Sequence, residues 1–82
     1  MSGPTRNAHH KDATRKLGTL IRELREMRGW SVPRLADEAD LTTDPIYGLE
    51  AHRSKYPTLV TIAKIARAFD FRASELLDDV GL

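Results

Sequence analysis

The 82-residue sequence contains no cysteine, which excludes disulfide bonds, thiolate metal sites and cysteine nucleophiles together. No apolar run approaches the roughly 20 residues that a helix needs to cross a bilayer. The N-terminal residues are polar and basic and lack the apolar segment of a secretory signal. These absences predict a cytoplasmic protein that does not enter a membrane.

The sequence also lacks a strong excess of charge of either sign, since its net charge is +1. Residues 1–16 carry four basic residues and one acidic residue, whereas residues 17–82 carry nine basic and eleven acidic residues. Any surface for nucleic acid must therefore come from local clusters of cations and from the N-terminal segment. A chain of this length forms one domain at most and has no room for a large catalytic cleft. We therefore expect neither an enzyme nor a bound cofactor.

The chain divides into two regions by composition. Residues 1–16 are expected to form a disordered, basic N-terminal arm, because they show no apolar periodicity and cannot bury enough surface to offset chain entropy. A first helix can begin within this segment, around Ala13. His9 and His10 are adjacent and have no third ligand nearby, so we interpret them as part of a solvated linker and not as a metal site. Residues 17–82 are expected to form the folded domain.

From Leu17 onward, apolar residues recur at steps of three and four, which predicts about five short helices and no strands. The signals for their ends are Gly29 after the first helix, Ser31 as N-cap of the second, Asp44–Pro45 at the start of the third, Pro57–Thr58 at the start of the fourth and Ser74 as N-cap of the fifth. The second and third helices are short and only a few residues separate them. Such a pair is typical of a helix-turn-helix.

An ordered series of short motifs runs through this region: Leu20–Arg25, Gly29–Ser31, Leu35–Ala36, Leu41–Thr42, Ile46, Leu49–Glu50, Pro57–Leu59, Ile62–Ala66, Phe69 and Glu75–Leu77. From Leu17 to Leu77 the chain thereby resembles the Cro and phage-repressor family of helix-turn-helix domains, also called Xre-like. The resemblance implies an all-α, compact, five-helix, lambda-repressor-like DNA-binding domain with a flexible N-terminal arm. It further implies a sequence-specific transcriptional regulator, a repressor, that binds double-stranded DNA as a homodimer.

In this family the third helix lies in the major groove and the N-terminus of the second helix meets phosphate. When these family roles are transferred to this sequence, the base-reading positions are Thr43, Asp44, Tyr47 and Gly48. The phosphate-contacting candidates are Ser31, Val32, Arg34, Arg53, Lys55 and Tyr56. The family also often pairs an arginine of the first helix with the glutamate that ends the third. Here that pair is Arg25 and Glu50, which we interpret as a structural ion pair.

Four positions depart from the family pattern. Val32 replaces the usual glutamine, so its side chain cannot donate to a phosphate, although backbone N–H groups at that helix start remain available. Asp44 either accepts a hydrogen bond from a cytosine amino group or caps its own helix. Gly48 offers no side chain to read a base. His52 replaces a glycine at a left-handed backbone position, which histidine tolerates better than bulkier residues.

These departures leave an alternative open. The chain can be a protein-interaction module on the same fold, antitoxin-like or regulator-binding, with weak or no DNA binding. Two further surfaces follow from the pattern: Trp30 is expected to cover the small core, in preference to serving as a contact residue for a partner, and Arg22, Arg25 and Arg28 are expected to form a salt-bridged solvent face. A dimer patch is expected near the C-terminus, at Phe71, Leu76, Leu77, Val80 and Leu82.

Overall fold

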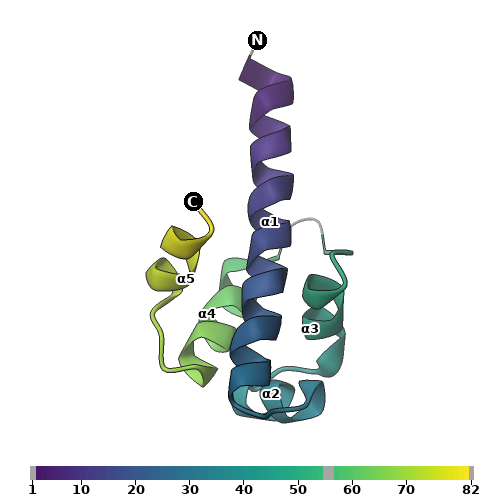
Figure 1. The fold of residues 1–82 in the computed structure, drawn as a ribbon, viewed down its shortest axis with the longest axis vertical. Coiled ribbons are helices and arrows are strands. Elements are labelled where there is room, and N and C mark those ends of the chain that lie inside the picture. The colour runs from purple at the N-terminus through teal and green to yellow at the C-terminus, as the bar shows by residue number, and fades with distance from the viewer. Residues whose placement is uncertain (1, 55–56, 82) are drawn as a thin grey trace.

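The computed structural model describes the backbone of residues 2–54 and 57–81, and the side chains of these residues from Asp12 onward. Over this range the chain forms five α-helices and no strand: α1 (Ser2–Met27), α2 (Val32–Ala39), α3 (Thr43–Glu50), α4 (Leu59–Ala68) and α5 (Ala73–Asp79). The predicted all-α, five-helix fold is confirmed. Helix α1 runs along the long axis, with α2 near its C-terminal end, α3 on one side and α4 and α5 on the other (Figure 1). None of the described helices is long and apolar enough to cross a membrane.

Helix α1 begins at Ser2, where the sequence predicted a disordered arm over residues 1–16. Ala13 is 2% exposed and belongs to the core together with Leu17 and Ile21. These three residues are four apart, so the apolar face of α1 continues one turn before the predicted boundary. The N-terminal half of α1 extends beyond the other helices (Figure 1). The side chains of His9 and His10 lie outside those that the structure describes.

The core is built from the apolar face of every helix. Its most deeply buried large side chains are Leu17, Ile21, Leu35, Ile46, Leu49, Ile65, Phe69 and Leu76. Within the described range, no buried side-chain polar atom lacks a hydrogen-bond partner. Helix α3 contributes Ile46 and Leu49 to this core, and its other side chains lie at least partly exposed.

Helices α1 to α4 are each followed, within two residues, by one residue in the left-handed conformation: Gly29 (φ 68°), Asp40 (56°), His52 (59°) and Asp70 (63°). After α3, for example, the His52 N–H donates to the Leu49 carbonyl (3.1 Å) and the Arg53 N–H donates to the Gly48 carbonyl (2.8 Å). This pair of bonds satisfies the free carbonyl groups of the last turn. The expected left-handed backbone at His52 is confirmed.

Of the predicted N-caps, Ser31 is confirmed, whereas Asp44 and Ser74 lie inside their helices. The Ser31 and Thr58 hydroxyl oxygens accept hydrogen bonds from backbone N–H groups in the first turns of α2 and α4. Helix α3 instead begins after Thr42, which places Asp44 inside its first turn. Helix α5 begins after Arg72, so Ser74 lies within the helix. The Glu75 carboxylate, in the first turn of α5, accepts a hydrogen bond from the backbone N–H of Arg72 (2.8 Å) and thereby caps the start of the helix.

The expected C-terminal dimer patch does not form as predicted. Leu76 and Val80 are buried in the core, and Leu77 is half-buried against it. Phe71 remains exposed, and Leu82 lies outside the described residues. The apolar residues of this segment therefore pack α5 on the core. They leave little apolar surface for contact with a second copy of the chain.

Candidate nucleic-acid interface

Helices α2 and α3 form the two halves of a helix-turn-helix, joined by the short segment 40–42. Helix α3 buries Ile46 and Leu49, which lie on one face of the helix. Its opposite face carries the four residues predicted to read bases: Thr43 and Gly48, which are partly exposed, and Asp44 and Tyr47, which are exposed. The Tyr47 side chain is 47% exposed. The structure thus brings all four predicted residues together on one outward-facing surface.

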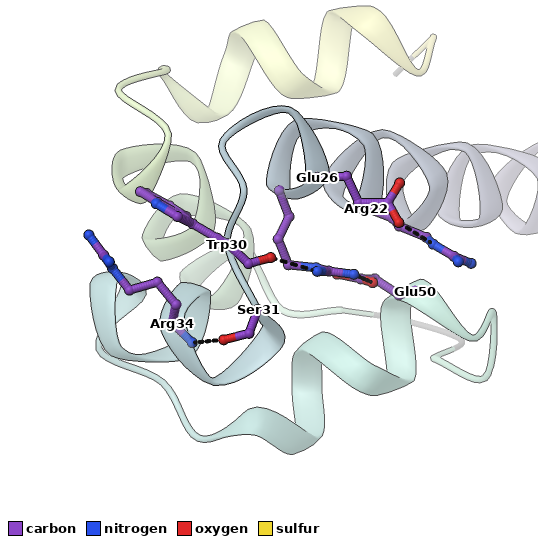
Figure 2. Close-up of polar contacts among 7 residues, drawn as sticks. Arg22, Glu26, Trp30, Ser31, Arg34 and Glu50 are labelled. Carbon is purple, nitrogen blue, oxygen red and sulfur yellow. Dashed lines mark hydrogen bonds and ion pairs between the residues drawn. The ribbon is translucent and has the colours of Figure 1, made fainter.

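The C-terminal end of α3 is attached to α1 by the predicted pair of Arg25 and Glu50 (Figure 2). Arg25 Nε donates to Glu50 Oε2 (2.8 Å) and Nη2 donates to Oε1 (2.9 Å), which is the two-pronged geometry of a strong arginine–carboxylate pair. Nη1 donates to the Trp30 carbonyl (2.7 Å). The two side chains are only 14% and 9% exposed. The hydrogen bond to Glu50 is the main cause that raises the pKa of Arg25 above its usual value.

A second contact between α1 and α3 was not predicted. Gly18 lies against the backbone of Leu49, and a Cβ atom at this position would overlap the Leu49 carbonyl oxygen. Only glycine therefore permits the observed approach of the two helices. An isolated glycine within a helical pattern is only a weak signal for such a contact, and it does not indicate which segment approaches.

The N-terminus of α2 presents only part of its predicted phosphate-contacting set. Ser31 is exposed, but its Oγ accepts a hydrogen bond from the Arg34 N–H (3.2 Å; Figure 2). Val32 is 8% exposed and its side chain belongs to the core, which leaves its backbone N–H group as the candidate phosphate contact. The side chain is buried because Val32 shares one face of α2 with Leu35 and Ala36. Arg34 is exposed and lies 4.0 Å from Glu38.

Trp30 covers the edge of the core, as predicted. Its ring is half-buried and stacks on Phe69 with centroids 5.7 Å apart and an interplanar angle of 15°. The guanidinium groups of Arg28 and Arg34 each lie 5.3 Å from the Trp30 ring centroid, within cation–π range. Arg28 Nη2 also donates to the Phe69 carbonyl (2.9 Å), where α4 ends.

The expected salt-bridged solvent face does not include Arg25, but Arg22 and Arg28 are exposed as expected, and Arg28 lies 3.9 Å from Asp70. Arg22 pairs with Glu26 (3.3 Å) on the exposed side of α1. Arg25 forms its ion pair with Glu50, and Arg28 donates a hydrogen bond to the Phe69 carbonyl at the end of α4. Spacing alone did not distinguish these roles, because the partners lie in distant parts of the chain.

A shallow groove separates α3 from the start of α4. Its lining includes Asp44, Gly48, Arg53, Ser54 and Thr58. Arg53 is exposed and its guanidinium forms no ion pair within the part of the chain that the structure describes. Lys55 and Tyr56, the remaining predicted phosphate contacts, lie outside the described residues. The groove therefore has mixed polar and apolar walls, and it places Arg53, which is unpaired among the described residues, beside the outward face of α3.

The arrangement of α2 and α3 agrees with comparisons to known proteins. Residues 18–82 match the model of the helix-turn-helix domain family. The chain belongs to this family. The predicted resemblance to its Xre-like members is thereby confirmed.

The helix-turn-helix domain also has a named relative. This chain is 36% identical over 56 residues to the HTH-type transcriptional regulator SutR of Escherichia coli (strain K12). The alignment covers 68% of this chain and 31% of that protein, so the chain spans about a third of the length of its relative. No solved structure matches the chain.

Proposed function

We propose that the chain is the DNA-binding part of a transcriptional regulator, in which α3 enters the major groove of double-stranded DNA. One observation carries the proposal: the face of α3 with Tyr47 is exposed, while its other face is fixed to α1 through Leu49 and Glu50. A helix that is presented outward and held rigidly is what base readout requires. The family match and the relative named as a transcriptional regulator support the same assignment.

The outward face of α3 has side chains that can recognise base edges. The Thr43 hydroxyl can donate to or accept from a base, and the Asp44 carboxylate can accept from a cytosine amino group. Asp44 is available for this role because Thr42, and not Asp44, precedes the first turn of α3. Tyr47 offers a ring for a thymine methyl group and a hydroxyl group for a base edge. Gly48 removes bulk from the same face, which permits close approach of the duplex.

The phosphate backbone is proposed to meet the cations beside this face. Arg53 is the strongest candidate, because it is exposed and its guanidinium is unpaired within the described residues. Arg34, Lys55, the hydroxyl groups of Ser31 and Tyr56, and the backbone N–H of Val32 complete the proposed set. Each phosphate that a cation neutralises adds about 0.9 to the slope of log affinity against log salt.

The test begins with selection of duplexes from a random pool, followed by fluorescence anisotropy titrations at several salt concentrations. Tyr47→Ala should remove the preference for the selected sequence. Arg53→Ala should weaken binding to every duplex and lower the salt slope by about 0.9. The matched control is Arg72→Ala, which removes an exposed arginine at the start of α5, on the other side of α1 from α3 (Figure 1). Failure of the selection, with binding indifferent to salt, would overturn the proposal.

The biological role is proposed to be repression in the cytoplasm by a homodimer that occupies an operator. Two recognition helices about 34 Å apart read half-sites one helical turn apart. A reporter gene downstream of the selected sequence tests this role. Expression should fall when the chain is supplied and recover with Tyr47→Ala, whereas a rise in expression would contradict repression.

A second candidate function is favoured by Asp44. Its exposed carboxylate has no ion-pair partner in the described part of the chain and would face the phosphates of DNA. This charge suits a protein partner with a basic surface, as in an antitoxin-like complex. Stoichiometric co-purification of such a partner, lost in Asp44→Asn and accompanied by a failed duplex selection, would favour this function over DNA binding.

A further inference from the structure

Two large apolar side chains are exposed side by side at the start of α4. Leu59 is 67% exposed and Val60 is 63% exposed. Ala63 is also exposed and lies between them on the same face of the helix. Single exposed hydrophobic residues are normal on a protein surface, but adjacent ones beside a groove indicate a contact site.

The groove lies between α4 and the C-terminal end of α2. Its walls are Glu38 and Ala39 from α2, Asp40 directly after α2, and Val60, Ala63, Lys64 and Arg67 from α4. We call these residues, together with Leu59, the α2–α4 patch. The patch has an acidic edge on α2, a basic edge on α4 and apolar side chains between them.

These charges are only partly used within the chain. Lys64 Nζ lies 3.7 Å from Asp40 Oδ2 and donates to the Asp40 carbonyl oxygen (3.2 Å). Arg67 forms no ion pair in the range that the structure describes, and Glu38 reaches only Arg34, at 4.0 Å. The charged groups of Glu38 and Arg67 therefore remain largely available for ion pairs with a partner.

We propose that the α2–α4 patch binds a second copy of this chain across a two-fold axis. An axis along the apolar strip places the acidic edge of each copy on the basic edge of the other, so that the patch is complementary to itself. Leu59 and Val60 of both copies then form the centre of the contact. The inference rests on the proposed function only for its choice of occupant, because a regulator that reads two half-sites requires two copies.

Another exposed apolar residue provides the control for this assignment. Met27 is 82% exposed at the end of α1 and does not line the groove. The C-terminal residues Leu76 and Val80, which the sequence suggested for a dimer, are buried. The α2–α4 patch thus combines adjacent large apolar side chains with complementary charges.

The first experiment measures self-association by sedimentation equilibrium without DNA. The chain should form dimers, and Leu59→Gln/Val60→Gln should raise the dimer dissociation constant at least about tenfold. Met27→Gln should leave the constant unchanged, and circular dichroism checks that all variants fold. A chain that stays monomeric at every concentration, or an unchanged constant in the double variant, overturns the inference.

The second experiment tests the charge pairing between copies. Glu38→Arg and Arg67→Glu should each weaken self-association, because each places like charges opposite one another. An equimolar mixture of the two variants should associate more tightly than either alone. In a mixed dimer the two introduced side chains face each other with opposite charges, and the unchanged Arg67 of one variant faces the unchanged Glu38 of the other. A mixture no tighter than its components overturns the inference.

The outcomes for the patch and for the proposed function are distinct. A monomeric chain that still binds a selected duplex overturns the patch and leaves the proposed DNA binding by α3 in place. A chain that dimerises through the patch but binds no duplex overturns the proposed function alone.

Discussion

Gly18 of α1 lies directly against the carbonyl oxygen of Leu49 in the last turn of α3. Arg25, two turns further along the same face of α1, holds Glu50 through two hydrogen bonds. The end of α3 is therefore fixed to α1 by a steric contact and an ion pair. This attachment sets the direction in which the outward face of α3 points.

Gly18→Ala is expected to destabilise the domain by about 1–3 kcal/mol, because the new methyl group overlaps a backbone atom that cannot move without shifting α3. The higher helix propensity of alanine offsets about 1 kcal/mol of a larger steric cost. Urea denaturation followed by circular dichroism measures the change in the free energy of unfolding. Unchanged or increased stability would show that α3 is not packed this closely on α1.

Gly48→Ala is the matched substitution in α3, and the opposite sign is expected. Among the described residues, a Cβ atom at Gly48 would have only the Ser54 Cβ nearby, at an ordinary contact distance of 3.9 Å. The gain in helix propensity then stabilises the domain by up to about 1 kcal/mol. The same denaturation experiment gives the result. Destabilisation here would mean that the outward face of α3 is covered by another part of the protein.

Removal of one partner of the Arg25–Glu50 pair is expected to be costly. Glu50→Gln leaves a nearly buried arginine without its counter-charge and should lower stability by about 3 kcal/mol. Arg22→Ala, which removes an exposed pair, should cost less than about 0.5 kcal/mol. A double-mutant cycle with Arg25→Met and Glu50→Met should give a coupling energy of about 1–3 kcal/mol. Additive single effects would show that the pair does not act as a unit.

The raised pKa of Arg25 fixes the sign of its pH dependence. A cation whose folded pKa lies above its unfolded pKa contributes stability that is fully present below the unfolded value. That contribution is lost only as the pH rises through the folded value. Since arginine titrates above about pH 12, Arg25 should add no slope to stability between about pH 7 and 10. A loss of stability in that window that disappears in Arg25→Met would contradict this assignment.

The sequence predicted the parts of the fold that follow from local periodicity. Leu17 and Ile21 mark the buried face of α1, and Ser31 marks the start of α2, because each effect operates within one or two turns. The pairing of Arg25 with Glu50 came from the resemblance to a family and not from spacing. The position of Asp44 was wrong because a helix that starts two residues earlier changes a capping residue into one of the first turn.

Other features depend on which segments the fold brings together. Val32 was assigned to a phosphate-facing position from the family pattern, and its spacing to Leu35 and Ala36 accounts for its buried side chain. Gly18 matters only because Leu49, in another helix, approaches it. No local pattern carries the distance between two helices, which is why this contact was missed while the helices themselves were predicted.

The left-handed backbone of His52 offers a stabilising substitution. Non-glycine residues in this conformation cost roughly 1–2 kcal/mol, and glycine avoids most of that cost. Because glycine also loses more entropy on folding, His52→Gly should stabilise the domain by about 0.5–1 kcal/mol. The neighbouring Ala51 has a right-handed backbone (φ −87°), so Ala51→Gly should destabilise by a similar amount.

Thermal unfolding of both variants, compared with the unmodified chain, measures the two effects side by side. His52 also lines a groove with Thr19, Leu20 and Glu23 of α1. If His52→Gly lowers the unfolding temperature, the imidazole contributes more through contacts with α1 than its backbone conformation costs. Equal destabilisation by both glycine substitutions would then identify His52 as a packing residue between α3 and α1.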